Sequence, residues 1–242
     1  MLAGAAFVAL SVPLFLALLR YVDRVRAPWS YVWTVGAVLA AVPAALAVGR
    51  LSHWGAFRAR DEDLYRVIGN VDTDLLTRMS QSATGIGDIT PSGFVAILTG
   101  LLLGYHFRSV RLLLVPIGAY LVSLRAQRLI DAIDNRPRPG PDLAVGAVGG
   151  FPSGGTVRVI VVVGVIAVAV VQVWRTRRDA IVVGAVLGAF VWVEIASRAV
   201  LGRHWPLDLV GGVVAGLLLL IAAAPLMRLP DASRPKHRPA QG

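Results

Sequence analysis

The sequence predicts an all-α, polytopic membrane protein, and two observations carry that prediction. Hydrophobic residues make up 56% of the 242-residue chain. They are gathered in blocks of about 16–21 residues, the length that crosses roughly 30 Å of hydrocarbon. Segments in hydrocarbon must be helical, because lipid offers no hydrogen-bond partner to an open backbone. We therefore expect one domain, built as a bundle of transmembrane helices.

The apolar blocks define seven spans separated by polar stretches. They are Leu2–Leu19, Ser30–Gly49, Ser92–Phe107, Val110–Ile130, Val159–Trp174, Ala180–Ala196 and Leu207–Met227. The third block is short, so we expect it to take further turns from its flanks. No basic segment precedes the first block and arginines follow it, which favours an uncleaved helix with its N-terminus outside over a signal peptide.

Two polar segments are not expected to cross the membrane. Residues 51–91 are too polar to span, and the stretch "NVDTDLLTRMSQ" within them opens with helix-capping residues before an apolar run. We expect one or two short helices there, on the outer membrane surface. Residues 229–242 are expected to form a disordered cytoplasmic tail, because "PDASRPKHRPAQG" has few residues that could enter a core.

Charge and composition limit the cellular setting. The net charge is +10 and Lys236 is the only lysine, an arginine bias typical of a high-GC genome, so we infer no nucleic-acid partner. The chain has no cysteine, which excludes disulfides and thiolate chemistry. The short basic turns, such as "RTRRD", alternate with the loops that carry the motifs below. The positive-inside rule then places these turns and the C-terminus in the cytoplasm, and the motif loops outside a bacterial cytoplasmic membrane.

The segment "SRAVLGRHWPLD", residues 197–208, joins the sixth span to the seventh and carries residues suited to catalysis. His204 and Asp208 are four residues apart, so they share one helical face. A carboxylate that accepts from one imidazole nitrogen fixes the tautomer and leaves the other nitrogen free as nucleophile or base. Arg198 can clamp phosphate oxygens with two parallel N–H groups.

Two further segments fall on the same side of the membrane. "NRPRPG" follows the fourth span with Arg136 and Arg138, and "PSGG" precedes the fifth with Ser153 and Gly154. A Ser-Gly turn that opens a helix aims backbone N–H groups at an anion. Any one of these arginines could simply snorkel at the membrane boundary. Three charged segments on one face of a bundle, however, cost several kcal/mol of desolvation unless they are used, so together they predict a phosphate site with an internal nucleophile.

These segments resemble the motifs of the type 2 phosphatidic acid phosphatase family, which shares its site with vanadium haloperoxidases. The family reads Lys, six residues, Arg-Pro; then Pro-Ser-Gly-His; then Ser-Arg, five residues, His, three residues, Asp. The third motif matches fully, the second matches at residues 152–154, and the first matches at Arg138 and Pro139. The resemblance extends over roughly residues 61–227, because "TGIGDITP" is similar to the segment with which family chains enter the membrane. It implies a six-helix core at residues 29–228, with residues 1–28 as one extra N-terminal transmembrane helix.

The resemblance also implies roles for individual residues. In the family, the histidine equivalent to His204 attacks phosphorus and forms a phosphohistidine, which Asp208 would orient and Arg198 would assist, with no metal or other cofactor. The implied ligand is a membrane lipid phosphate or pyrophosphate, with isoprenoid carriers among the candidates. The residues implied to hold phosphate oxygens are Arg138, Arg198, Ser153 and Gly154, with Arg136 as a further phosphate-binding candidate.

Two positions depart from the family pattern. Asp131 occupies the position of the family's lysine, which inverts the charge, and we expect Arg128 or Arg136 to take up that charge. Gly155 occupies the position of the histidine that protonates the leaving group. Loss of a general acid typically costs about 10²–10⁴ in rate. We therefore expect any phosphatase activity to be impaired or specialised.

Three accounts of Gly155 stay open. The substrate could carry a good leaving group such as phosphate. Another acid could replace the histidine, with Asp131, Asp134 and Glu194 as candidates, although Glu194 is four residues before Arg198 and is expected to pair with it. Catalysis could also be absent, leaving a lipid-phosphate-binding, transport or assembly protein on the same fold. We expect a real gap at Gly155 and a phosphatase that favours phosphate as its leaving group.

Overall fold

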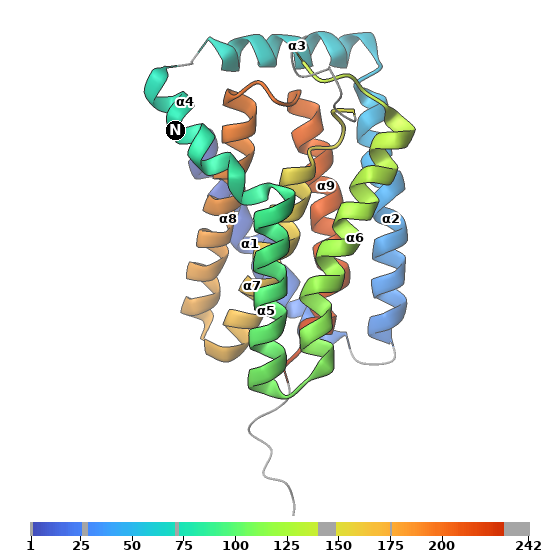
Figure 1. Ribbon diagram of the computed structural model, residues 1–242, viewed down its shortest axis with the longest axis vertical. Coiled ribbons are helices and arrows are strands. Elements are labelled where there is room, and N and C mark those ends of the chain that lie inside the picture. The colour runs from blue at the N-terminus through green and yellow to red at the C-terminus, as the bar shows by residue number, and fades with distance from the viewer. Residues whose placement is uncertain (1, 26–28, 71–72, 140–148, 175, 230–242) are drawn as a thin grey trace, which may run out of the picture.

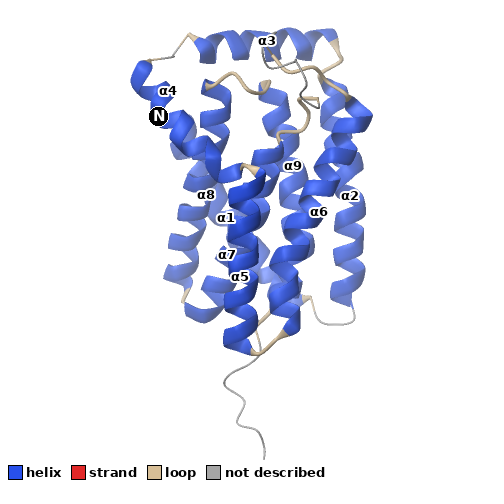
Figure 2. Ribbon diagram, in the orientation of Figure 1, coloured by secondary structure: helices blue, strands red, loops and turns tan. Residues whose placement is uncertain are grey.

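The computed structural model describes residues 2–25, 29–70, 73–139, 149–174 and 176–229, and the secondary structure of these residues is entirely helical (Figure 2). The seven long helices are α1 (Leu2–Arg24), α2 (Trp29–Leu51), α5 (Ile89–Phe107), α6 (Val110–Asp134), α7 (Gly154–Trp174), α8 (Arg177–Val200) and α9 (Pro206–Ala223). Among the described residues, seven helices are long and apolar enough to cross a membrane, which confirms the predicted spans. The predicted tail at residues 230–242 lies outside the described residues.

Shorter helical elements fill the polar stretches. They are α3 (Gly55–Gly69), α4 (Asp74–Ala83) and the 3₁₀ turns η1 (Thr84–Gly87) and η3 (Ala224–Met227). Two helices between the second and third spans agree with the expectation of one or two. In α4, Thr73 accepts a hydrogen bond from the Leu76 N–H, so the capping residues in "NVDTDLLTRMSQ" mark a helix start as predicted.

The helix ends that carry the motifs extend beyond the predicted spans. The third span, α5, begins at Ile89 rather than Ser92, so it takes a turn from its flank as expected. The fourth, α6, continues through Asp131 to Asp134, and the fifth, α7, begins at Gly154 rather than Val159. Asp131 is therefore a helical residue rather than a loop residue, and Gly154 and Gly155 of the "PSGG" segment are the first residues of α7.

Helix α7 is the centre of the bundle. Of its most apolar 18-residue window 72% is buried, against 11% for α1. Its sequence is apolar on every side, which is typical of a helix surrounded by others. It packs on α6, α8 and α9. A Cβ on Gly164 would overlap the Leu220 side chain of α9, so glycine is what allows these two helices to approach.

Helix α1 is part of the same core rather than an appendage. Phe15, Leu18 and Val22 belong to the cluster that also contains residues of α7, α8 and α9. Ser11 Oγ lies 3.0 Å from the Gly184 carbonyl oxygen across the α1–α8 contact, and a Cβ on Gly188 would overlap Ser11. Small residues of this kind let membrane helices pack closely. The division into an added helix at residues 1–28 and a six-helix core stays a prediction. In the structure, α1 packs directly against helices of that core.

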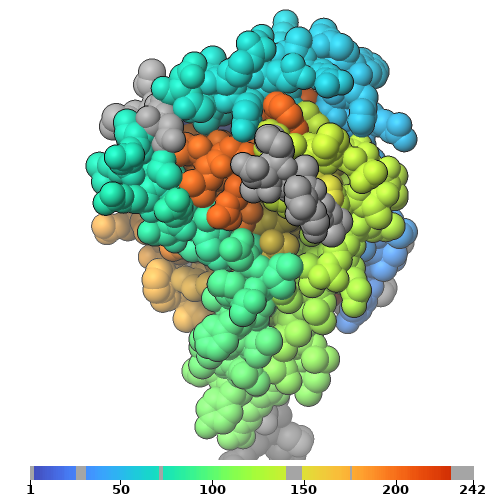
Figure 3. All heavy atoms as spheres, turned by 45° about the horizontal axis from the view of Figure 1, so that its top comes forward, coloured from blue at the N-terminus to red at the C-terminus, as the bar shows by residue number. Residues whose placement is uncertain are grey.

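The motif-bearing helix ends gather toward one end of the bundle, in the upper half of Figure 1. In Figure 1 the end of α6 and the α8–α9 connection lie near the top, with α3 across this end, and the starts of α5 and α7 lie lower, toward the middle of the view. Figure 3 shows the same end tilted toward the viewer, where α3, α4, the end of α6 and the α8–α9 connection meet. The three motifs, far apart in the sequence, therefore face one region.

Candidate active site

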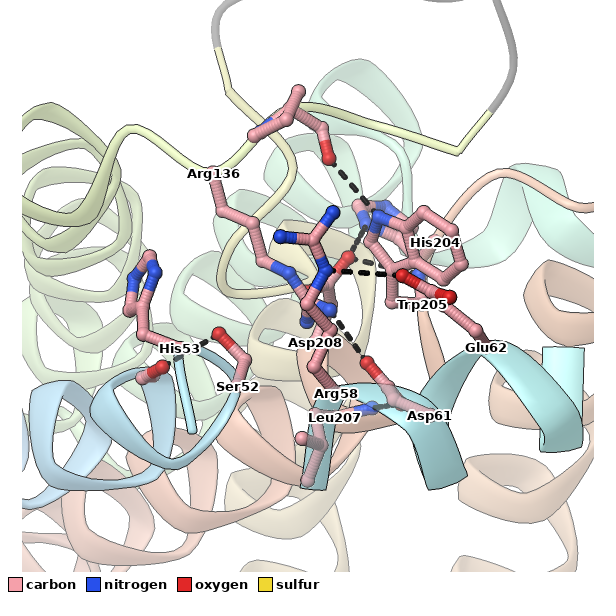
Figure 4. A network of polar contacts seen from close by, with 12 residues as sticks. Ser52, His53, Arg58, Asp61, Glu62, Arg136, His204, Trp205, Leu207 and Asp208 are labelled. Carbon is pink, nitrogen blue, oxygen red and sulfur yellow. Dashed lines mark hydrogen bonds and ion pairs between the residues drawn. The ribbon is translucent and has the colours of Figure 1, made fainter. Parts of the chain in front are cut away.

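His204 lies in the short connection between α8 and α9 and is 2% exposed. Its Nδ1 is 2.8 Å from the Gly150 carbonyl oxygen (Figure 4). Because a carbonyl can only accept, Nδ1 carries the proton and Nε2 keeps its lone pair. Asp208 Oδ2 lies 3.6 Å from Nδ1, an ion-pair distance that is too long for a hydrogen bond. The ring is thus oriented by the Gly150 carbonyl, with Asp208 nearby, and not by the direct Asp208 hydrogen bond expected from the motif.

Asp208 is fully buried, and its carboxylate is shared between two partners. Oδ1 accepts from Arg136 Nη1 at 2.8 Å, and Oδ2 accepts from the Trp205 N–H at 2.9 Å at the start of α9. Arg136 Nη2 also donates to Asp61 Oδ2 at 2.5 Å, and Asp61 Oδ1 accepts from the Leu207 N–H at 2.8 Å. Figure 4 shows this chain of contacts. Arg136 is therefore held by two carboxylates, and its geometry is that of a structural cation rather than the expected phosphate ligand.

The second motif supplies the start of α7. The Ser153 N–H donates to the Asp208 carbonyl at 2.9 Å, and Thr156 Oγ1 donates to Ser153 Oγ at 3.1 Å. The Ser153 N–H is thus occupied, and the N–H groups of the first turn of α7, beginning at Gly154, are the remaining backbone donors at this helix start. The backbone anion site expected from Ser153 and Gly154 therefore has one N–H donor fewer, because the Ser153 N–H is already used.

The space beside Gly155 is filled by the guanidinium of Arg198. A Cβ on Gly155 would overlap the central carbon and two nitrogens of that group. Arg198 Nε lies 2.5 Å from Glu194 Oε1, and Nη2 lies 3.0 Å from Asp88 Oδ1 and 3.3 Å from the Thr84 carbonyl oxygen. The expected pairing of Glu194 with Arg198 is confirmed. Arg198 rather than an acid therefore occupies the space beside Gly155, and the predicted gap, meaning the lack of a general acid at residue 155, stays a prediction.

A second glycine borders the same ion pair. A Cβ on Gly87, in η1, would overlap Glu194 Oε1 and would lie 2.8 Å from the Gly155 carbonyl oxygen. The Glu194–Arg198 pair of α8 is therefore enclosed by two residues without side chains, one in η1 and one in α7. This arrangement brings η1 into direct contact with the start of α7.

Arg138 lies beside His204 and forms no ion pair with a carboxylate among the described residues. A Cβ on Gly150 would be 3.3 Å from both Arg138 Cγ and Asp208 Oδ2, so Arg138 borders the support of the imidazole. Its buried Nε has no hydrogen-bond partner among the described residues. Burial, followed by the nearby Arg198, lowers the pKa of Arg138 from its ordinary value. A phosphate would relieve both effects.

Asp131 is buried and has no hydrogen-bond partner among the described residues. It is 1% exposed, and neither carboxylate oxygen makes a hydrogen bond with a described residue. Arg128 is exposed and Arg136 binds other carboxylates, so the expectation that one of these arginines takes up the charge is wrong. Asp134, one turn later, lies 3.4 Å from His53 Nε2 and keeps Oδ2 unpaired.

Electrostatics connects the first and third motifs at the imidazole. Burial lowers the pKa of His204 from its ordinary value; Asp208 opposes this, and Arg138 and Arg198 add to it. The imidazole therefore stays neutral at lower pH than an exposed histidine would. Because both arginines act on the same ring, the structure brings Arg138, Arg198, His204 and Asp208 together.

Three residues that shape the site are absent from the sequence motifs: Asp61, Asp88 and Arg158. Asp61 lies in "RDED", which looks like an exposed helix face, and Asp88 lies in "TGIGDITP" just before α5. Arg158 lies in the second turn of α7, is 6% exposed and donates from Nε to the Gly87 carbonyl at 2.8 Å. An arginine inside an apolar span is itself a sequence signal, and it could have been noticed. Across the part of the chain that is described, no group of three or more His, Cys, Asp or Glu side chains is placed to hold a metal ion.

Comparisons with known proteins bear on the fold and on the region that carries the motifs. Residues 131–229 match the model of the PAP2 superfamily. The fold is similar to the crystal structure of the first transmembrane PAP2 type phosphatidylglycerolphosphate phosphatase from Bacillus subtilis, with a TM-score of 0.69 and 21% identity over 77% of this chain and 93% of that chain. No curated protein matches the sequence. The resemblance predicted from the three motifs is thus confirmed over residues 131–229, which match the PAP2 superfamily model and lie within a polytopic all-helical membrane fold.

Proposed function

We propose that this chain is a membrane lipid-phosphate or lipid-pyrophosphate phosphatase that works through a phosphohistidine at His204. The observation that carries the proposal is the state of the imidazole. Nδ1 is committed to the Gly150 carbonyl, and no hydrogen bond from a described residue reaches Nε2. A neutral imidazole beside Arg138 and Arg198 has the arrangement needed to attack phosphorus while cations hold the phosphate oxygens.

The proposed reaction has two steps. His204 Nε2 attacks phosphorus, the bond from phosphorus to the leaving oxygen breaks, and a phosphohistidine forms. Asp208, 3.6 Å from Nδ1, stabilises the positive charge that develops on the ring. Water then attacks phosphorus, the N–P bond breaks, and inorganic phosphate leaves with His204 restored.

The second motif favours a good leaving group. Residue 155 has no side chain to donate a proton, and the space beside it is taken by Arg198. An alkoxide leaving group needs a proton in the transition state, whereas a phosphate leaving group needs it much less. We therefore place lipid pyrophosphates, isoprenoid ones among them, ahead of lipid monophosphates as substrates.

The rival function is non-catalytic binding, transport or assembly around a lipid phosphate. Two observations favour it. A proton donor is missing at Gly155, and Arg198 is already held by Glu194 and Asp88. The two functions share their ligand, so binding alone does not distinguish them.

A phosphate-release assay separates the two. The purified protein in detergent is tested on matched lipid monophosphates and pyrophosphates, and His204→Ala serves as the control. We expect release with wild type, faster from pyrophosphates, and none with His204→Ala. Lipid-phosphate binding that depends on Arg138, without release in either protein, would establish the rival.

The proposed setting is a bacterial cytoplasmic membrane, with the site outside and the C-terminus inside. The native chain has no cysteine, so single cysteines report orientation cleanly. Arg60→Cys, in α3 near the site, and Arg178→Cys, at the opposite end in α8, both replace exposed arginines. We expect an impermeant reagent added to intact cells to label the first and spare the second. The reverse pattern would invert the orientation.

A further inference from the structure

Asp88 is the carboxylate on the outward side of Arg198. It lies between η1 and α5, and its Oδ1 is 3.0 Å from Arg198 Nη2. A Cβ on Gly155 would overlap the same guanidinium. The Arg198 guanidinium therefore lies next to residue 155, and the Asp88 carboxylate is within hydrogen-bond distance of that guanidinium. A long side chain at residue 155 would reach the same region.

The other nearby carboxylates are sealed from water. Glu194 and Asp131 are each 1% exposed, and Asp208 is not exposed at all. The side chain of Asp134 is 2% exposed and lies beside His53. The side chain of Asp88 is 50% exposed. Among these groups it is the one that can exchange protons with solvent while touching a residue of the site.

The direction of the Asp88 side chain is informative in itself. Asp88 is the N-cap residue of α5, a position where aspartate usually accepts a hydrogen bond from the helix's own first turn. Here the side chain makes no capping hydrogen bond and pairs with Arg198 instead. The carboxylate is thus committed to the site rather than to its helix.

The order of groups suits an in-line displacement. Arg198 acts electrostatically on His204 and is paired directly with Asp88. A phosphate held by Arg198 would have the nucleophilic imidazole and the Asp88 carboxylate as neighbours. In such displacements the leaving oxygen of the first step and the attacking water of the second both lie on the side of phosphorus opposite the histidine, and a proton acceptor for the water is needed on that side.

We propose that Asp88 is the general base that hydrolyses the phosphohistidine, a role that rests on the proposed function. In the first step the Nε2–P bond forms, the P–O bond breaks and the phosphate leaving group departs with the electron pair. In the second step the oxygen of water bonds to phosphorus and its proton passes to the Asp88 carboxylate. The N–P bond breaks, the electron pair returns to Nε2, and Asp88 releases its proton to solvent.

The test is the lifetime of the phosphoenzyme in Asp88→Asn. The protein is mixed with a radiolabelled lipid pyrophosphate, quenched in alkali and assayed for protein-bound phosphate. Asparagine keeps the size of aspartate and a carbonyl oxygen for Arg198 but cannot accept the proton. We expect the phosphoenzyme to form and then to decay about 10²–10⁴-fold more slowly than in wild type.

Two further variants separate proton transfer from positioning. Asp88→Ser keeps a residue that can cap α5 and should accumulate phosphoenzyme in the same way, which excludes a folding defect as the cause. Glu194→Gln alters the other carboxylate on Arg198 and should raise KM without slowing phosphoenzyme decay. Equal accumulation in Glu194→Gln would overturn the assignment, because Asp88 would then act only by holding Arg198.

Other outcomes are equally decisive. Wild-type decay in Asp88→Asn refutes the base role while leaving the phosphatase intact. Faster turnover in Asp88→Asn also refutes it, and shows instead that Asp88 competes with substrate for Arg198. If wild type and His204→Ala alike form no phosphoenzyme and release no phosphate, the proposed function itself fails, and this role fails with it.

Discussion

The two halves of the candidate site differ in how completely their polar atoms are paired. In one half, His204, Asp208, Arg136 and Asp61 form a continuous set of hydrogen bonds and ion pairs. The other half contains Asp131, Asp134 and Arg138, together with the surroundings of Arg198. Every buried side-chain polar atom without a hydrogen bond in the described residues belongs to it: Thr84 Oγ1, Asp131 Oδ1 and Oδ2, Asp134 Oδ2, Arg138 Nε and Glu194 Oε2.

This difference assigns the two halves different tasks. Buried polar atoms are paired in native proteins, so a cluster of unpaired ones needs water or a ligand to complete it. The paired half holds the imidazole in one tautomer and orientation whether or not substrate is present. The unpaired half is the part that a phosphate group and its counter-charges would complete. The predictions below test this division, beginning with the largest expected effect.

Breaking the paired half should cost the most stability. Asp61→Ala leaves Arg136 buried with one of its two carboxylates, and breaking a buried ion pair costs about 3–5 kcal/mol. Arg58→Ala is the control, because its pair with Glu62 has side chains 70% and 38% exposed, and exposed pairs contribute about 0–1 kcal/mol. Unfolding in detergent measures both. Similar losses would show that Asp61 is not part of a rigid support.

A side chain at residue 155 should disable the unpaired half. The Cβ of Gly155→Ala overlaps the guanidinium of Arg198, so Arg198 must leave its position. Loss of one positioned donor lowers kcat by about 10²–10³. Gly69→Ala is the control, since a Cβ there meets nothing within 4 Å. Gly155→His should also lose activity, and faster turnover of alkoxide substrates by this variant would instead show that a histidine fits at residue 155 and supplies the missing general acid.

Neutralising a carboxylate should have opposite effects in the two halves. Asp131→Asn removes an unpaired buried charge and should raise the free energy of unfolding by about 1–3 kcal/mol. Asp208→Asn weakens the pair with Arg136 and should lower it. Asp131→Lys should strengthen binding of inorganic phosphate, measured by calorimetry. Changes of the same sign in Asp131→Asn and Asp208→Asn would erase the distinction between the halves.

The smallest expected effect is on pH dependence. Burial lowers the pKa of His204. The pH-independent plateau of kcat/KM should therefore extend from neutral pH down to below about pH 6.5, the ordinary pKa of histidine. The lowered pKa of His204 also makes the free energy of unfolding depend on pH. As the pH falls, His204 is protonated in the unfolded chain before it is protonated in the folded protein. The stabilisation that His204 contributes is therefore complete above about pH 6.5 and declines as the pH falls below that value. An acid limb above pH 6.5 would mean that the imidazole is charged more easily than its burial implies.

The sequence was sufficient for the membrane architecture but not for the pairing of charges. Span length and apolar composition predicted all seven crossings, and motif spacing predicted that Arg138, Arg198 and His204 meet. The partners of the arginines were missed because they come from the polar stretch between the second and third spans. Asp61 is 75 residues from Arg136, and Asp88 is 110 from Arg198. Local spacing rules describe neighbours on one helix and carry no information about contacts of that kind.

The surroundings of Gly155 also could not be predicted from local sequence spacing. In the sequence alone, a glycine at the position of a histidine indicates only that a side chain is missing. In three dimensions the vacated volume holds the guanidinium of a residue from another helix. Whether a missing side chain leaves space or admits a neighbour depends on packing, which single-sequence reasoning does not contain.

The enclosure of the Glu194–Arg198 pair by Gly87 and Gly155 has an evolutionary consequence. A side chain at either glycine displaces a member of the pair, so the effects of substitutions at these positions depend on one another. A histidine at residue 155 cannot be accommodated by one substitution unless Arg198 first takes another position. We therefore expect the four residues to be kept or replaced as a group.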